Sequence, residues 1–291
     1  MDVFVPRTLD EALEIKAARP DAVPIAGGTD LMVELNLNRR RPRALLDVSR
    51  LAELRRCGRE DGAVFLGAGV SYTRVIAELP ECVPLAQASR AVGSPQIRNR
   101  GTVGGNLGTA SPAGDALPVL AAYDAEIVVA TRDGARALPW AQFLVGPKQT
   151  ALPPDGLILG ARWRIARGPG SFSKVGTRNA MVIAIASLCL VLDEEQRAVR
   201  VALGSVGPTV LRAPDAEAYA AEAMARAGTW DDPAALPAPR EIEEWAQRVA
   251  GAARPIDDVR GTAAYRRHAC AALARRALRW ALEDRRAGGR A

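Results

Sequence analysis

The chain has 291 residues, of which 48% are hydrophobic and 25% are charged, and its formal net charge is +6. These proportions are those of a globular protein, and the length corresponds to about two domains. The sequence has no apolar run of about 18 residues, no basic-then-apolar start and no nucleic-acid motif beside its arginines. We therefore expect a cytoplasmic protein with no membrane span and no nucleic-acid partner.

The first 55 residues or so have the pattern of a βαβ unit. Thr8 followed by Glu11 is the capping-box arrangement and predicts the start of a helix over residues 8–19. The apolar run AVPI then predicts a short strand, which ends at a glycine pair and is followed by a second helix. The segment RALLDVS, residues 43–49, predicts the next strand.

Residues 60 to 165 hold strands and helices in mixed order. An Asp133-Gly134 pair inside one apolar stretch predicts a two-residue hairpin turn. The predicted strands cover residues 63–69, 125–139 with the hairpin, and 156–165, and the predicted helices cover 71–79, 83–92 and 116–124. The segment GAGVSY, which opens the first of these helices, has Tyr72 where a dinucleotide fingerprint has its third glycine, so we interpret it as a helix-entry turn.

The pattern changes from about residue 170 onward. Three consecutive segments, residues 171–179, 181–193 and 198–207, have the pattern of strands, which are most simply antiparallel. Alanine-rich helical segments follow, at residues 215–227, 240–250 and 262–286. The predicted fold class is therefore α+β, with a mixed N-terminal region and a C-terminal region of three strands and several helices.

Two glycine pairs are the first candidates for a functional site. Gly27 and Gly28 end a predicted strand and precede a predicted helix, with Thr29 and Asp30 next. Backbone N–H groups at such a junction face outward and favour an anion. Taken alone, a glycine pair is more often a tight turn.

The second pair lies about seventy-five residues further along. Thr102 precedes Gly104 and Gly105, which permit close backbone approach, and Asn106 adds an amide that donates and accepts hydrogen bonds. Asp115 follows ten residues after Gly105 and could accept hydrogen bonds from sugar hydroxyls. Together the two segments suggest two loops that close on one diphosphate-containing ligand.

Other residue types argue against a metal centre or a hydrolase. The four cysteines, at positions 57, 82, 189 and 270, are far apart in sequence and form no zinc or iron–sulfur motif. His268 is the only histidine, which excludes a site with several histidines and makes a Ser-His-Asp hydrolase improbable. We expect no metal ligands and no catalytic acid or base on this chain.

Four segments resemble the FAD-binding subunits of the molybdenum hydroxylases, a family of xanthine dehydrogenase and carbon monoxide dehydrogenase type. They are PIAGGTDLM, IRNRGTVGGNLGTASPAGD, FSKVGTRNAMVIA and DVRGTAAYRRHACAALARRAL. The resemblance implies a two-subdomain FAD-binding domain of the vanillyl-alcohol-oxidase (PCMH) type over residues 1–167, divided near residue 55. It implies a small C-terminal domain of three antiparallel strands and a helical bundle over residues 168–291.

The resemblance also implies which residues contact FAD. They are Ile25, Ala26, Gly27, Gly28, Thr29, Asp30 and Leu31 along the diphosphate, Thr102, Gly104, Gly105 and Asn106 in the second loop, Asp115 at the ribitol or ribose, and Ile158, Lys174 and Val92 near the isoalloxazine. A cation at position 174 could stabilise reduced, anionic flavin. Neither glycine segment holds a histidine or cysteine, so we expect FAD to be bound without a covalent link.

The implied role is electron transfer within a larger enzyme. Electrons from a molybdenum cofactor would pass through [2Fe–2S] clusters to FAD, and then to NAD or another acceptor. The molybdenum and iron–sulfur centres would lie on partner chains, in a dimer of heterotrimers, with xanthine or a purine as the favoured substrate. Two alternatives stay open: a self-contained flavin reductase on the same fold, and a flavin-binding module without catalysis.

Overall fold

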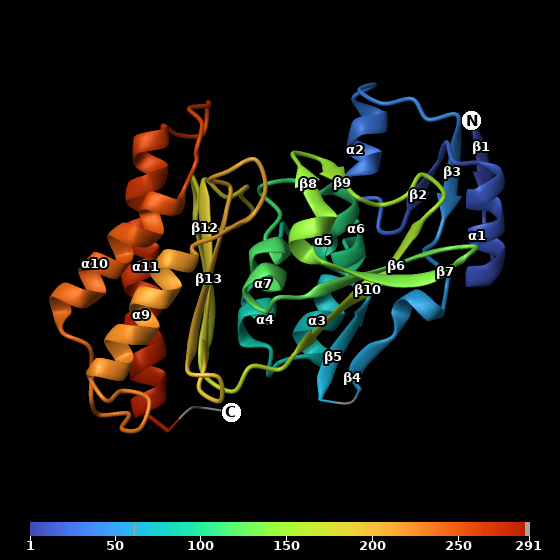
Figure 1. Cartoon of the computed structure of the whole chain (residues 1–291). Coiled ribbons are helices and arrows are strands. Elements are labelled where there is room, and N and C mark those ends of the chain that lie inside the picture. Colours follow the sequence, from blue (N-terminus) through green and yellow to red (C-terminus); the bar gives the residue numbers. More distant parts are fainter. Residues whose placement is uncertain (61, 289–291) are drawn as a thin grey trace. The chain divides into compact units, whose positions relative to one another are not determined.

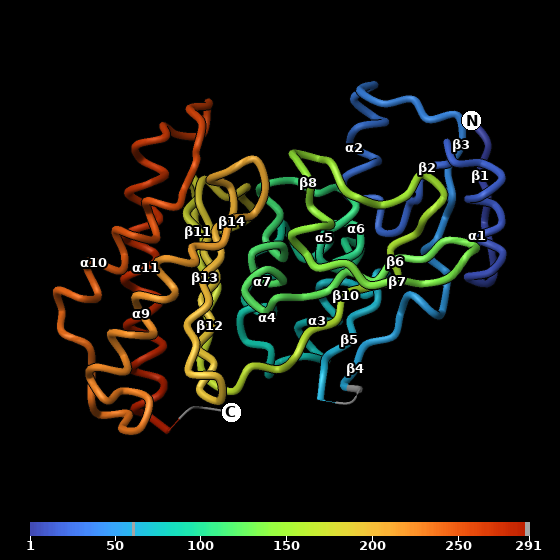
Figure 2. Tube along the Cα trace, in the orientation of Figure 1, coloured from blue at the N-terminus to red at the C-terminus, as the bar shows by residue number. Residues whose placement is uncertain are grey.

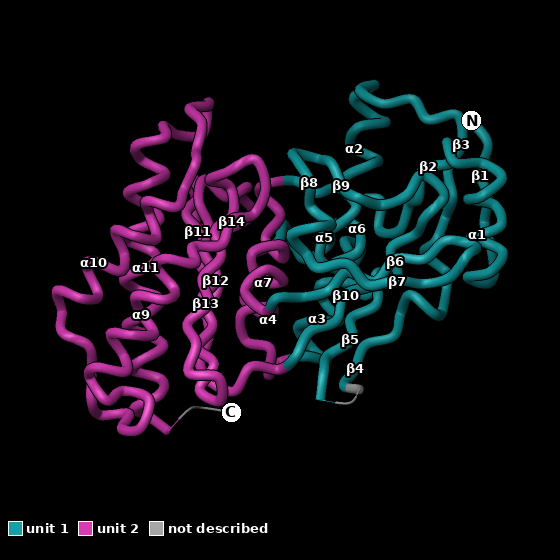
Figure 3. Tube along the Cα trace, in the orientation of Figure 1, with its two compact units in different colours: residues 1–79, 92–111, 124–164 teal, residues 80–91, 112–123, 165–291 magenta. Residues whose placement is uncertain are grey.

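The computed structural model describes residues 1–60 and 62–288, which form two compact units. Unit 1 comprises residues 1–79, 92–111 and 124–164, and unit 2 comprises residues 80–91, 112–123 and the chain from 165 onward (Figure 3). The chain leaves unit 1 and returns to it twice before it enters unit 2 for the last time, and Figure 2 shows the path of the chain from its N-terminus to its C-terminus. Each unit is therefore described by itself.

Unit 1 begins with a small parallel sheet. Its strands are β1 (Asp2–Phe4), β2 (Ala22–Ile25) and β3 (Ala44–Asp47), in the order β1-β3-β2. Helix α1 (Leu9–Ala18) begins where the capping box predicts, because the Thr8 hydroxyl accepts from the Glu11 N–H at 3.2 Å. Helix α2 (Leu31–Asn36) follows β2 and completes the predicted βαβ unit.

A five-stranded antiparallel sheet forms the rest of the unit 1 framework. In sheet order its strands are β4 (Cys57–Glu60), β5 (Ala63–Gly67), β10 (Leu157–Arg164), β6 (Glu126–Thr131) and β7 (Gly134–Pro139). The predicted hairpin is confirmed, but its two turn residues are Arg132 and Asp133, because Thr131 pairs with Gly134, which already belongs to β7. Residues from both sheets share one apolar core, which includes Leu46, Leu51 and Leu157.

Short helices connect the strands of unit 1. They are the 3-10 helix η1 (Glu53–Arg55), α3 (Tyr72–Glu78), α5 (Pro95–Arg100), α6 (Val103–Thr109) and α8 (Trp140–Phe143), and a small hairpin of β8 (Leu144–Gly146) and β9 (Gln149–Thr150) follows α8. The Ser71 hydroxyl caps α3 by accepting from the Arg74 N–H. The interpretation of GAGVSY as a helix-entry turn is therefore confirmed.

Unit 2 is built on one antiparallel sheet (Figure 1). Its strands are β11 (Gly170–Val175), β12 (Ala186–Asp193), β13 (Ala198–Gly204) and β14 (Leu211–Arg212), in chain order across the sheet. Alternate residues of β12, such as Leu188 and Leu190, join the apolar core of the helices α9 (Pro214–Arg226), α10 (Pro239–Ala252) and α11 (Ala263–Arg286). The predicted antiparallel strands and C-terminal helices are thus confirmed.

The other face of this sheet is covered by two helices from earlier in the chain. Helices α4 (Val83–Ala91) and α7 (Ala116–Ala122) contact strands β11, β12 and β13. Gly204 permits this close packing, since a Cβ there would lie 2.8 Å from the Pro118 side chain. All of β12 is therefore buried, because helices pack on both of its faces.

Some elements differ from the sequence prediction. The strand predicted over 181–193 begins only at Ala186, since Met181 has a left-handed φ of 51° and the chain loops there. Strand β14 and the helices α5 and α6 were not predicted. Helix α6 contains three glycines, whose low helix propensity concealed it.

Candidate functional site

The two glycine segments lie against each other in unit 1. A Cβ on Gly27 would lie 1.9 Å from the carbonyl oxygen of Arg100, which directly precedes the second segment. Gly28 has a φ of +75°, a conformation that residues other than glycine rarely adopt. The first glycine is therefore required for packing against residues 100–101, and the second is required for the turn of the backbone.

The first segment presents a row of unused backbone donors. Among the residues that the structure describes, the N–H groups of Gly27, Gly28, Thr29 and Asp30 have no hydrogen-bond acceptor. Successive N–H groups around a residue with positive φ form a concave nest, which favours an anion. The junction between β2 and α2 therefore has the backbone N–H groups that the sequence predicted there and that favour an anion.

The second segment is organised differently. Thr102 caps α6, and its hydroxyl accepts from the Gly105 N–H at 2.9 Å. The N–H groups of Val103, Gly104 and Asn106 are also bound within the chain, to carbonyl oxygens of residues 70, 68 and 102. The backbone donors at the start of α6 are therefore already used.

The two glycines of the second segment have different surroundings. A Cβ on Gly104 would lie 2.4 Å from the Cβ of Ala68, so this glycine allows α6 to pack against the end of β5. A Cβ on Gly105 would meet only the Thr102 hydroxyl, at 3.2 Å. The Asn106 Oδ1 atom is buried and has no partner in the described part of the chain. Gly105 and Asn106 thus offer an open approach and an unused acceptor to a ligand.

Side-chain bonds hold the two segments together. The Thr109 hydroxyl, at the end of α6, donates to Asp30 Oδ2 at 2.8 Å. The Arg100 Nε atom donates to the Gly27 carbonyl at 3.4 Å. Asp30 is therefore engaged within the protein, as a link between the two segments, and its backbone N–H is the part that stays available.

Two further predicted site residues lie in unit 1. Ile158 stands at a bulge of β10, and its Cδ1 atom would lie 3.6 Å from a Cβ on Gly108, so it reaches α6. Val92 is half-buried, and its carbonyl accepts from the Arg98 guanidinium at 3.1 Å. Ile158 is thus close to the second segment, whereas Val92 takes part in the turn before α5.

Asp115 and Lys174 form an ion pair inside unit 2. The Lys174 Nζ atom lies 2.6 Å from Asp115 Oδ2, with side-chain exposures of 11% and 8%. The same ammonium donates to the carbonyls of Ala91 and Val182. Burial raises the pKa of the Asp115 carboxyl to about 6, although the Lys174 ammonium opposes this effect. The structure therefore brings together two residues that are 59 positions apart in the sequence.

The free oxygen of Asp115 is relevant to ligand binding. Asp115 Oδ1 is buried and has no hydrogen-bond partner among the described residues. A buried carboxylate oxygen without a donor costs free energy, so a hydroxyl donor from a ligand would stabilise it. This is consistent with the prediction that Asp115 accepts a hydrogen bond from a sugar hydroxyl.

The ion pair also predicts a stability effect. Replacing Lys174 by methionine should lower the free energy of unfolding of the flavin-free chain by about 3 kcal/mol, because Asp115 loses its buried partner. Lys148→Met is the matched control and should cost less than about 1 kcal/mol, since its ion pair with Glu34 is exposed. Urea unfolding measures the free energy of unfolding of both variants. Equal decreases would show that the buried ion pair stabilises the fold no more than the exposed one.

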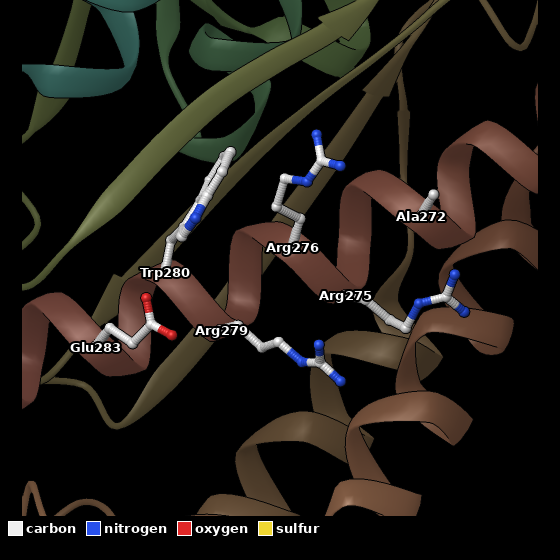
Figure 4. Close-up of a pocket in the computed structure, with 6 residues that line it drawn as sticks. All are labelled: Ala272, Arg275, Arg276, Arg279, Trp280 and Glu283. Carbon is white, nitrogen blue, oxygen red and sulfur yellow. The ribbon is translucent and has the colours of Figure 1, made fainter.

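A shallow groove along α11 is a different kind of site (Figure 4). It is lined by Ala272, Arg275, Arg276, Arg279, Trp280 and Glu283. Arg275 is held by Glu243 at 2.8 Å, and Arg276 lies over the Trp280 ring, 5.6 Å from its centroid. All six residues lie on one helix and none is a glycine, so the groove does not repeat the amide nest of unit 1.

Unit 1 contains a parallel βαβ unit whose second strand ends in an amide nest, and hydrogen bonds tie this nest to the second glycine segment. This is the arrangement of a nucleotide-cofactor-binding protein. The family described as "FAD binding domain in molybdopterin dehydrogenase" matches residues 1–162, so the chain belongs to this family. Residues 171–281 match the "CO dehydrogenase flavoprotein C-terminal domain". The resemblance proposed from the four sequence segments is confirmed.

Two curated relatives differ greatly in length. Over 194 aligned residues, the chain is 32% identical to the nicotinate dehydrogenase FAD-subunit of Eubacterium barkeri. The aligned region covers 63% of this chain and 66% of that protein. Over 237 aligned residues, it is 30% identical to the xanthine dehydrogenase of Emericella nidulans. This aligned region covers 74% of this chain and only 17% of that protein. The chain therefore spans less than two thirds of either relative.

One relative matches over nearly the full length in both sequence and structure. The carbon monoxide dehydrogenase medium chain of Hydrogenophaga pseudoflava is 28% identical over 288 residues, which cover 95% of each chain. A solved structure of carbon monoxide dehydrogenase from that organism, lacking the Mo-pyranopterin moiety, superposes with a TM-score of 0.85. The aligned region has 26% identity and covers 97% of each chain.

These findings confirm the predicted class of protein. The chain belongs to the FAD-binding family of the molybdopterin dehydrogenases, with an FAD-binding domain followed by a CO dehydrogenase flavoprotein C-terminal domain. Its relatives include the medium chain of a carbon monoxide dehydrogenase and the FAD-subunit of a nicotinate dehydrogenase. None of the helices within residues 1–60 and 62–288 is long and apolar enough to cross a membrane.

Proposed function

We propose that the amide nest of residues 27–30 binds the diphosphate of FAD. The observation that carries this proposal is the row of four N–H groups without an acceptor, next to a glycine with positive φ. The unpartnered Asn106 Oδ1 and the open face of Gly105 lie on the adjoining segment and fit a ligand there. Residues 103 and 104 shape the site through their packing and their hydrogen bonds within the chain.

The other predicted contacts belong to the same proposal. Ile25, Ala26 and Leu31 flank the nest, Thr102 holds the Gly105 N–H in place, and Ile158 and Val92 contribute apolar surface. Asp115 and Lys174 contribute a carboxylate oxygen and a cation to the ribityl chain and the isoalloxazine. Bound FAD accepts and releases electrons; the protein residues bind it, orient it and set the charge around it.

We propose electron transfer from iron–sulfur clusters on a partner chain, through FAD, to NAD or another acceptor. A large molybdopterin-binding chain would complete the enzyme, as a dimer of heterotrimers in the cytoplasm. Xanthine or a related purine is the favoured substrate, and it would react on the molybdenum chain. What supports this proposal is the family membership and the likeness to a medium chain over 95% of its length.

The mode of FAD attachment gives the first test. The purified chain should hold one FAD, and acid precipitation should release all of the yellow colour into the supernatant. The reason is that residues 25–31 and 102–106 contain no histidine or cysteine for a covalent link. Colour that remains in the pellet would contradict non-covalent binding, and a colourless chain that does not bind added FAD would contradict the proposed function itself.

A further inference from the structure

The ammonium group of Lys174 is fully occupied by the protein. A lysine ammonium has three N–H groups and accepts no hydrogen bond. The Nζ atom donates to Asp115 Oδ2 at 2.6 Å, to the Ala91 carbonyl at 2.8 Å and to the Val182 carbonyl at 3.0 Å. The side chain is only 11% exposed, so these acceptors replace water around the charge. Lys174 therefore has no N–H group left for a ligand, although it belongs to the proposed flavin site.

The three acceptors come from three separate segments of unit 2. Ala91 is the last residue of α4, Asp115 directly precedes α7, and Val182 lies in the loop between β11 and β12. Lys174 itself stands on β11. One buried side chain thus joins the end of a helix, the start of another helix and a loop, and it fixes their positions around the ammonium.

The loop between β11 and β12 is shaped so that it returns to Lys174. A Cβ on Gly176 would collide with the side chain of Val182, so only glycine leaves room for this return. Met181, which precedes Val182, has a left-handed φ of 51°. The Arg178 Nε atom donates to the Met181 carbonyl at 3.1 Å. These local features direct the Val182 carbonyl to the ammonium.

The same arrangement leaves one carboxylate oxygen of Asp115 free. Oδ2 accepts from Lys174, whereas Oδ1 is buried and has no partner in the part of the chain that the structure describes. Because the side chain is 8% exposed and one of its oxygens is held by the ion pair, the direction of the other oxygen is fixed too. A ligand hydroxyl would meet an acceptor that needs no reordering.

We propose that Lys174 is a positioning residue for FAD that acts through Asp115. It holds the carboxylate so that Oδ1 accepts from a ribityl or ribose hydroxyl, and it donates no hydrogen bond to the cofactor. This inference rests on the proposed function, because it requires FAD to bind beside Asp115. Any effect of Lys174 on the isoalloxazine is then an effect of its charge and not of a direct hydrogen bond.

A double-mutant cycle in the full-length, flavin-free chain tests this inference. FAD affinity is measured by fluorescence titration for Asp115→Ala, for Lys174→Met and for the two changes together. Asp115→Ala should weaken FAD binding by roughly tenfold or more, since it removes the charged acceptor of a hydrogen bond. The double variant should bind FAD within about twofold of Asp115→Ala, because Lys174 then has no carboxylate to position.

The comparison of Asp115→Ala with the double variant decides the result even if Lys174→Met alone does not fold. Lys174→Met leaves a buried carboxylate without its cation, whereas the double variant replaces the pair by apolar groups and leaves no unpaired charge. Lys148→Met is the control, since its ion pair with Glu34 is exposed, and it should bind FAD as the wild type does. A further loss of about tenfold in the double variant would overturn the inference, because Lys174 would then contribute to binding independently of Asp115.

The pH profile of FAD affinity gives a readout that a loss of packing would not change. Burial raises the pKa of the Asp115 carboxyl to about 6, and the Lys174 ammonium opposes this rise. The carboxylate gains a proton as the pH falls through this value, so wild-type affinity should decrease there. In Lys174→Met the decrease should begin at higher pH, because the ammonium no longer opposes the effect of burial. In Asp115→Ala this decrease should be absent, and that variant controls for all other titrating groups.

Identical pH profiles in the wild type and in Lys174→Met would contradict a function of Lys174 through Asp115. A wild-type chain that binds no FAD at all would contradict the proposed function, and this inference with it. A wild-type chain that binds FAD, together with a double variant much weaker than Asp115→Ala, would contradict this inference alone.

Discussion

The isolated FAD-loaded chain should remain oxidised when it is mixed anaerobically with xanthine or any other hydroxylation substrate. Flavin absorbance at about 450 nm should fall only when the iron–sulfur and molybdenum chains are added. The chain has a single histidine, His268, and four cysteines that are far apart in sequence, so it offers no ligand set for a cluster and no evident acid–base pair for a carbon substrate. The expected difference in reduction rate is several orders of magnitude.

Stopped-flow absorbance of the lone chain and of the assembled complex measures this difference. NADH is the positive control, because hydride transfer to a flavin needs no protein acid or base, and slow reduction by NADH shows that the flavin is accessible and active. Rapid reduction of the lone chain by xanthine would contradict the subunit function and favour a self-contained flavoenzyme. No reduction by any donor, in the chain or in the complex, would favour a binding module without catalysis.

Replacing Gly104 by valine should destabilise the fold, whereas the same change at Gly105 should mainly remove FAD. The new valine side chain would enter the space of Ala68, at a Cβ distance of 2.4 Å, and overpacking of this kind typically costs about 1–3 kcal/mol. A side chain on Gly105 meets only the Thr102 hydroxyl, at 3.2 Å, so the helix tolerates it, but it would occupy the open approach of the ligand.

The two adjacent glycines act as matched controls for each other. Thermal unfolding of the flavin-free variants should show a large loss for Gly104→Val and a small one for Gly105→Val. FAD titration of the folded Gly105→Val chain should show affinity at least tenfold below that of the wild type. Equal affinity for FAD would mean that the second glycine segment does not face the cofactor, and the proposed site would then reduce to residues 27–30.

The local pattern of the sequence was sufficient for most elements. The capping box at Thr8, the Asp-Gly hairpin and the runs of apolar residues depend on neighbours within a few positions, and they predicted α1, β6, β7 and the strands β11, β12 and β13 of unit 2. The same is true of the nest at Gly28, because a strand that ends in glycines before a helix exposes backbone N–H groups by itself.

Helices α5 and α6 could not be predicted in this way. The glycines of α6 are poor helix formers, but Gly104 lies where only a hydrogen atom fits beside Ala68. Packing against β5 therefore outweighs the low intrinsic propensity of this segment. The function of Asp30 was also hidden, because its partner Thr109 lies 79 residues away in the sequence.

The sequence alone determined the class of the protein, the order of its elements and the two segments that hold the candidate site, since these depend on local patterns and on a family resemblance. Only the tertiary structure decided what each residue does. It showed that Gly27 and Gly104 make room for the chain itself, that Gly105 stays open, and that Lys174 pairs with Asp115. The physical reason is that each of these roles depends on atoms from distant parts of the chain, which meet only after folding.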